Sequence, residues 1–268
     1  MSFYTFFTLR FILYKNKSFI WESKKNRFKV IKIITSININ LLTGIDMQKK
    51  SVLNNTINFA KGNFTNNVLL WGTRGNGKST LIKSIFNFVS KDYTPLRLIQ
   101  LNKNNIGDIE LIYSILGKFK DLRFIIFIDD LSFEKNNSDY TIIKSTLEGT
   151  IQNQPRNIIL YITSNRRHLM ARNMIDNERS SAIHTDENIE EQISLSDRFG
   201  LWIGFHKFSQ EEYLKIIKNY CEYYKINYSN ENIKDGIKWS LQRGNRTGRT
   251  AWQYVVQIAA DKNLKINF

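Results

Sequence analysis

Cysteine, histidine and proline are all scarce in this chain of 268 residues, and each shortage excludes something. Cys221 is the only cysteine, so the chain cannot form an internal disulfide, and the reducing cytoplasm is the simplest setting for it. His168, His184 and His206 are scattered without metal-ligand spacing, so we expect no zinc site. With only two prolines and no long low-complexity stretch, nothing marks the chain as disordered.

A hydrophobic run long enough to cross a bilayer is also missing. Met1–Tyr14 is apolar and aromatic, but it is short and Arg10 interrupts it. It lacks the positively charged start and the small-residue cleavage site of a signal peptide. We therefore expect an arm or strand that packs on the rest of the protein, and no membrane partner; a start codon assigned too early is the alternative.

Acidic residues are outnumbered: 24 Asp and Glu stand against 39 Lys and Arg, for a formal net charge of +15. The imbalance is greatest in residues 1–44, which carry one acid, Glu22, and eight basic residues: Arg10, Lys15, Lys17, Lys24, Lys25, Arg27, Lys29 and Lys32. A basic arm can contact nucleic acid or anionic lipid, and a solvated surface is the plain alternative.

The strongest motif is a glycine-rich loop between a strand and a helix. Residues 72–79 have the spacing G-x-x-x-x-G-K-S, the signature of a phosphate-binding P-loop. The apolar run Val68–Trp71 precedes it, and Thr80–Val89 follows with apolar residues at helical spacing. This order collects backbone N–H groups and the positive end of a helix dipole at one point, which suits a polyphosphate. The residues expected to bind them are Gly72, Thr73, Arg74, Gly75, Asn76, Gly77, Lys78, Ser79 and Thr80.

Within this motif, Lys78 would reach the terminal phosphates and the Ser79 hydroxyl would bind Mg²⁺. A second metal ligand is expected at Asp129, which with Asp130 ends an apolar strand in the Walker B arrangement. Asp130 would orient or deprotonate the attacking water. Asn165 ends the next strand along the chain and would position that water.

Arginines later in the chain are candidates for transition-state stabilisation. Arg198 precedes a predicted strand and would act on the nucleotide of a neighbouring subunit; an ion pair with Asp197 is the alternative. Arg249, and as second choice Arg246, would fold onto the phosphates. The acidic stretch Asp176–Asp197 is expected to be a solvated loop and helix or a partner-binding insertion.

The order of elements predicts a parallel α/β sheet followed by a small all-α lid. The predicted strands are Val68–Trp71, Leu96–Leu101, Phe124–Asp130, Asn157–Thr163 and Leu201–Phe205, with a weaker strand signal at Phe28–Ile34. The predicted helices are Gly44–Ala60, Thr80–Val89, Asp108–Leu116, Asp139–Glu148, Tyr213–Tyr224, Asn232–Gln242 and Thr250–Asp261. A capping box at Ser209–Glu212 opens the lid. We divide the chain into a basic arm (1–40), a P-loop core (41–206) and a helical lid (207–268). The turn Leu41–Ile45, through Ile45, would cover an adenine ring.

Taken together, the chain resembles the AAA+ ATPases, and more closely an uncharacterised bacterial AAA+-like family known as a domain of unknown function. The matching segments read LTGIDMQK, NNVLLWGTRGNGKSTLIK, FIDDLSFE, SNRRHL, SLSDRFGLW and RTGRTAWQYV. The resemblance implies a five-stranded core with a helical lid, binding of ATP and Mg²⁺, and assembly into a homo-oligomeric ring or filament. It also makes Asn165 the sensor-1, Arg198 the arginine-finger and Arg249 the sensor-2 position. One departure is Asp130, where the wider family has glutamate, and Glu134 is a substitute base.

The function expected on this basis is an ATPase that remodels or regulates a macromolecular partner. An ATP-dependent switch or scaffold with little hydrolysis, associated with nucleic acid, is the alternative that Asp130 suggests. A small-molecule kinase fits less well, because an arginine before the fifth strand and a late helical lid are not typical of that class.

Overall fold

The computed structural model describes residues 3–132, 138–148, 154–167, 169 and 198–266. Within these residues the centre of the protein is one seven-stranded sheet with the order β2-β1-β4-β5-β6-β3-β7. The strands are β1 Ser18–Glu22, β2 Arg27–Val30, β3 Val68–Gly72, β4 Leu96–Leu101, β5 Arg123–Ile128, β6 Ile158–Ser164 and β7 Leu201–Phe205. The five strands predicted for the core are therefore present as β3–β7.

The prediction of a five-stranded, wholly parallel sheet is wrong at its β4 edge, where the basic N-terminal region adds two strands. β1 runs parallel to β4, and β2 returns antiparallel to β1 as a hairpin. All other neighbouring strands are parallel. The hairpin joins the sheet because its apolar side chains Phe19, Trp21 and Phe28 are buried in the same hydrophobic cluster as the central strands.

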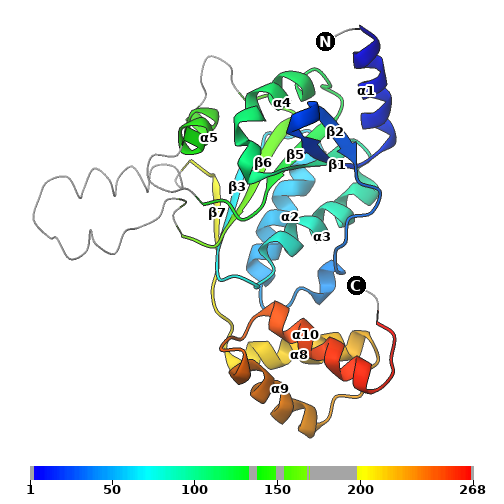
Figure 1. Ribbon diagram of the computed structural model, residues 1–268, viewed down its shortest axis with the longest axis vertical. Coiled ribbons are helices and arrows are strands. Elements are labelled where there is room, and N and C mark those ends of the chain that lie inside the picture. The colour runs from blue at the N-terminus through cyan, green and yellow to red at the C-terminus, as the bar shows by residue number, and fades with distance from the viewer. Residues whose placement is uncertain (1–2, 133–137, 149–153, 168, 170–197, 267–268) are drawn as a thin grey trace, which may run out of the picture.

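Helices cover both faces of the sheet (Figure 1). On one face lie α2 (Asp46–Ala60) and α3 (Lys78–Asp92), whose apolar side chains form one buried cluster with that face. On the other face lie α4 (Ile109–Leu116) and α5 (Ser138–Glu148), which contribute to a second cluster. The strands between them are buried on both sides, as expected for a parallel sheet.

The first 15 residues contain a helix, α1 (Phe3–Lys15), where the sequence suggested an arm or strand. The Phe6 ring stacks on Phe119 at 5.2 Å between centroids, and Leu13 is completely buried. Phe6, Leu9, Ile12 and Leu13 recur at helical spacing, so a helix places all four on the core while a strand would turn half of them away. Among the described residues, no helix has both the length and the apolar character needed to cross a membrane.

After β7 the chain forms a C-terminal helical unit, which Figure 1 shows at the end of the core near α2 and α3. It consists of α8 (Gln210–Tyr223), α9 (Asn230–Gln242) and α10 (Gly248–Asp261). The predicted capping box is confirmed: Glu212 N donates to Ser209 Oγ, and Ser209 N donates to the Glu212 side chain. Ser229 caps α9 in the same way. The divisions at residues 40 and 206 stay predictions.

Candidate functional site

The P-loop follows β3 and turns sharply into α3, because three of its glycines have positive φ angles. Gly72 has φ +118°, and a Cβ there would come within 2.2 Å of the Phe205 carbonyl oxygen, so β3 and β7 can be this close only with glycine. Gly75 (φ +86°) and Gly77 (φ +89°) complete the turn, with Gly77 as the N-cap of α3. The loop backbone therefore surrounds the N-terminus of α3, as an anion site requires.

Lys78 is a buried cation held by neutral acceptors. Its Nζ donates to the carbonyl oxygens of Gly72 (2.7 Å) and Thr73 (2.9 Å) and to Asn165 Oδ1 (3.1 Å). Burial lowers the pKa of Lys78 to about 8; the nearby carboxylates of Asp130 and Asp129 oppose this shift. Within the part of the chain that the structure describes, the Lys78 ammonium has no carboxylate at ion-pair distance. A buried cation in this situation is matched by an anion, so the residues present fit a polyphosphate.

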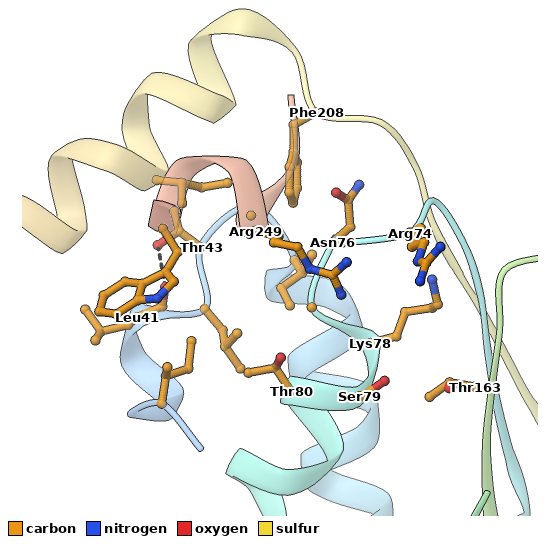
Figure 2. A pocket seen from close by; sticks show the side chains of 18 of the residues that line it. Leu41, Thr43, Arg74, Asn76, Lys78, Ser79, Thr80, Thr163, Phe208 and Arg249 are labelled. Atoms are coloured by element: carbon orange, nitrogen blue, oxygen red, sulfur yellow. Dashed lines mark hydrogen bonds between the residues drawn. The ribbon is translucent and has the colours of Figure 1, made fainter. Parts of the chain in front are cut away.

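Ser79 and Asp129 meet across the cleft between α3 and β5. The Ser79 hydroxyl donates to Asp129 Oδ1 at 2.5 Å, and the Thr163 hydroxyl donates to the same oxygen at 2.6 Å. A hydroxyl and a carboxylate oxygen at this separation are hard oxygen donors of the kind that Mg²⁺ prefers. The predicted pair of metal ligands is thus brought together, and Figure 2 shows Thr163 facing Ser79.

Asp130 and Asn165 form a second polar pair beside the first. Asp130 is held in the left-handed region at φ +54°, and its N–H donates to Thr163 Oγ1 at 2.9 Å. Asn165 Nδ2 donates to the Asp130 carboxylate, while Asn165 Oδ1 accepts from Lys78. The Asn165 amide therefore links the P-loop lysine to the second acid of the strand end.

These groups line one end of a cavity of about 520 Å³. Arg74, Asn76 and Thr80 of the predicted set also line it, whereas Thr73 lines a separate cavity. The other end of the large cavity is mostly apolar, and its walls are Ile37, Leu41, Leu42, Thr43, Ile45, Phe208, Ile216, Tyr220 and Trp252. The turn Leu41–Ile45 forms part of this apolar end (Figure 2), and its contact with an adenine ring stays a prediction.

Phe208, Tyr220 and Trp252 of this apolar wall were missed by the sequence analysis, as was Thr163 at the polar end. Trp252 lies three residues after Arg249, on the same side of the last helix, so helical spacing could have indicated it. Phe208 and Tyr220 gave no such signal, because their position depends on how the helical unit packs against the core.

The first turn of α10 packs directly on the P-loop. Arg249 N donates to the Gly75 carbonyl oxygen at 3.0 Å, and a Cβ on Gly75 would lie 3.0 Å from Thr247 Oγ1. The Arg249 side chain lines the large cavity and extends toward Lys78 (Figure 2). Arg246, the second choice, instead donates to Gln210 Oε1 at 3.3 Å and lines the separate cavity of about 330 Å³ beside Thr73.

Arg198 is not part of this cavity. It lies three residues before β7, and β7 runs parallel to β3, so Arg198 is near the N-terminal ends of these two strands. The P-loop follows the C-terminal end of β3 and is therefore on the opposite side of the sheet, one strand length away. Glu134, His184 and the acidic stretch 176–197 lie outside the described residues, and their roles stay predictions.

Comparison with solved structures identifies the class of fold. A single-site variant of RuvB from Thermotoga maritima has a TM-score of 0.55 and 19% identity over 86% of this chain and 68% of its own. ORC1 from Aeropyrum pernix, in complex with DNA, has a TM-score of 0.54 and 14% identity over 85% and 65%. Domain III of the replication initiation protein DnaA from Thermotoga maritima has a TM-score of 0.51 and 16% identity over 86% and 91%. The fold is thus that of the AAA+ P-loop ATPases, and the chain spans about two thirds of the RuvB and ORC1 chains.

The family follows from the sequence itself. Residues 14–262 match the family described as "Protein of unknown function (DUF815)", and the chain belongs to it. No match to a curated protein was found.

Proposed function

We propose that this protein binds ATP with Mg²⁺ and hydrolyses it to remodel or regulate a macromolecular partner. The observation that carries the proposal is one cavity lined by a buried cation, by a hydroxyl–carboxylate pair and, at its other end, by apolar side chains. Lys78 would bind the terminal phosphates, while the turn Leu41–Ile45, Phe208 and Trp252 would enclose the adenine ring.

The remaining residues of the site have separate tasks in this proposal. Ser79 and Asp129 would hold the metal ion, which when bound supplies positive charge to the phosphate oxygens. Asp130, with Asn165 on its carboxylate, would hold and deprotonate the attacking water. The Arg249 guanidinium would bind phosphate oxygens from the α10 side of the cavity.

A neighbouring copy would complete the site with Arg198. The position of Arg198 near the N-terminal ends of β3 and β7 supports this, because from there the side chain cannot reach the pocket of its own chain. Assembly into a homo-oligomer would then be required for rapid hydrolysis. The structure of ORC1 is a complex with DNA and DnaA is a replication initiation protein, which supports a nucleic acid or a protein bound to it as the partner.

The test measures MgATP binding and turnover for the full chain and for matched variants. Lys78→Ala should abolish binding, whereas Lys91→Ala, on an exposed lysine of the same helix, should change neither quantity. Asp130→Asn should keep MgATP binding and lose turnover. Unimpaired MgATP binding by Lys78→Ala would contradict the proposal.

A second candidate, an ATP-dependent switch with little hydrolysis, is favoured by one observation. The carboxylate of Asp130 is already occupied by Asn165, and its backbone is held in the left-handed region. An aspartate so restrained reaches less far than a glutamate. Single-turnover measurements separate the two functions: rapid hydrolysis lost in Asp130→Asn supports the ATPase, and tight binding with negligible cleavage in the natural chain supports the switch.

A further inference from the structure

The helix α1 is apolar on two faces, one packed on the core and one exposed. Its inner residues Phe6, Leu9 and Leu13 pack on the core. Its outer face presents Phe7, Phe11 and Tyr14, with 52%, 66% and 39% of their surfaces exposed. Three large aromatic side chains on the outside of one helix form a larger exposed patch than isolated surface residues do, and such patches mark binding sites.

Cations lie directly over these rings. The Arg10 guanidinium carbon is 5.4 Å from the centroid of the Tyr14 ring, and Lys15 Nζ is 5.5 Å from that of Phe11. The helix contains no acidic residue. The Tyr14 hydroxyl donates to Asp121 at the margin of the face, so this carboxylate is engaged by the protein. The outer face therefore alternates aromatic rings with positive charge.

The β1–β2 hairpin, the next segment of the chain, is also strongly basic. Lys24, Lys25, Arg27, Lys29 and Lys32 are all exposed on or just after it. Glu22 is the only acid of the hairpin, and Arg27 at 2.7 Å and Lys29 at 3.7 Å already neutralise it. The hairpin and α1 share one hydrophobic cluster and lie at the end of the molecule away from the helical unit (Figure 1). We call the outer face of α1 and the hairpin together the arm surface.

We propose that the arm surface binds single-stranded nucleic acid, with Phe7, Phe11 and Tyr14 stacking on bases and the flanking cations contacting phosphates. This deepens the proposed function, on which it rests, by naming the class of macromolecular partner. Stacking on exposed rings requires unpaired bases, which a single strand offers and a duplex does not. An anionic membrane surface is the competing partner, and the vesicle measurement below distinguishes it from the single strand.

The experiment measures fluorescence anisotropy of a labelled oligothymidine with the full chain over a range of salt concentrations. Phe11→Ala should weaken binding by about tenfold or more through loss of stacking. Lys24→Ala combined with Lys25→Ala should lower the slope of log affinity against log salt by about 1.4, since each phosphate contact on a single strand contributes about 0.7. Tyr223→Ala, and Lys215→Ala with Lys234→Ala, are the matched controls on the helical unit and should change neither.

ATP binding by the same variants separates this inference from the proposed function. Lys78→Ala should lose MgATP and still bind oligothymidine in the absence of nucleotide. Absence of oligothymidine binding at low salt by a chain that binds MgATP would overturn the inference alone. So would an unchanged affinity in Phe11→Ala together with an unchanged salt slope in the double lysine variant, or binding to phosphatidylserine vesicles in place of the oligonucleotide.

Discussion

At the scale of single residues, the hydroxyl of Thr163 holds both acids that follow β5. It donates to Asp129 Oδ1 at 2.6 Å and accepts from the Asp130 N–H at 2.9 Å, and the residue is 1% exposed. Thr163→Val keeps the shape of the side chain and removes both bonds. We expect Mg²⁺-dependent turnover to fall by about 10- to 100-fold, as for other residues that orient metal ligands, while ATP binding without metal persists.

The conservative variant Thr163→Ser is the control for this prediction, because it keeps the hydroxyl and should keep most of the turnover. Titration of turnover against Mg²⁺ concentration provides the measurement. An unaltered Mg²⁺ dependence in Thr163→Val would show that Asp129 is oriented without this hydroxyl.

The pKa of about 8 for Lys78 predicts how ATP binding depends on pH. Below pH 8 the ammonium is protonated and attracts phosphate; above it, the free protein loses this proton. Bound phosphate favours the charged form, so binding above pH 8 must take up a proton, and affinity should fall as pH rises. Calorimetry in buffers of different ionisation enthalpy measures this uptake. Lys78→Arg, whose guanidinium stays protonated over this range, should show none, and equal uptake in that variant would assign the proton to another group.

Much of the candidate site could be predicted from residues that are close in sequence. The P-loop places Lys78 and Ser79 through local backbone geometry, so the residues of the motif and their spacing were enough to predict both positions. The contact between Asn165 and Asp130 instead depends on β5 and β6 being neighbours in the sheet. Thr163 went unnoticed for the same reason: a threonine near a strand end is ordinary until the partner strand is known.

At the scale of secondary-structure elements, α10 supports the P-loop through its first turn. Thr247 caps the helix, accepting from Thr250 N at 3.1 Å, and its side chain lies against Gly75. Thr247→Val should therefore destabilise the protein by about 1 kcal/mol and also weaken ATP binding, because the cap and the loop share this residue. Thermal unfolding and nucleotide titration measure the two effects.

Ser209→Ala is the matched control for the Thr247 variant. Ser209 caps α8 in a comparable way, but the side chains beside Gly75 are those of Thr247 and Arg249. Its loss should lower stability by a similar amount and leave ATP affinity unchanged. Equal effects of the two substitutions on affinity would mean that any weakening of the helical unit impairs binding, with no special role for the contact between α10 and Gly75.

The elements of the core were predictable because each strand is mostly apolar and each helix has apolar residues at helical spacing. β4 and β7 have the bounds that the sequence indicated. The N-terminal region was harder, since Met1–Tyr14 is apolar at most positions and its sequence alone does not distinguish a helix from a strand. Packing decides which structure forms. Leu13 and Phe6 of α1 pack on the core, and β1 of the hairpin pairs with β4.

At the scale of the whole molecule, the separation of Arg198 from the pocket predicts that activity depends on assembly. Turnover per chain should rise with protein concentration, and Arg198→Ala should reduce it by about 10³-fold or more if the arginine acts on a neighbour. Mixing Arg198→Ala with Lys78→Ala should restore turnover above the sum of the two separate samples, because one variant supplies the arginine and the other an intact P-loop. If the mixture is no more active than the two samples measured separately, Arg198 does not act on the nucleotide of a neighbouring copy.

The placement of Arg198 and the P-loop at opposite ends of the strands also links the symmetry of such an assembly to the completeness of its pockets. In an antiparallel twofold dimer each copy would complete the pocket of the other, and the assembly would stop at two copies. Head-to-tail contacts would instead give the assembly a direction. A closed ring then has every pocket completed, whereas an open helix leaves one terminal subunit able to hold ATP and unable to cleave it quickly.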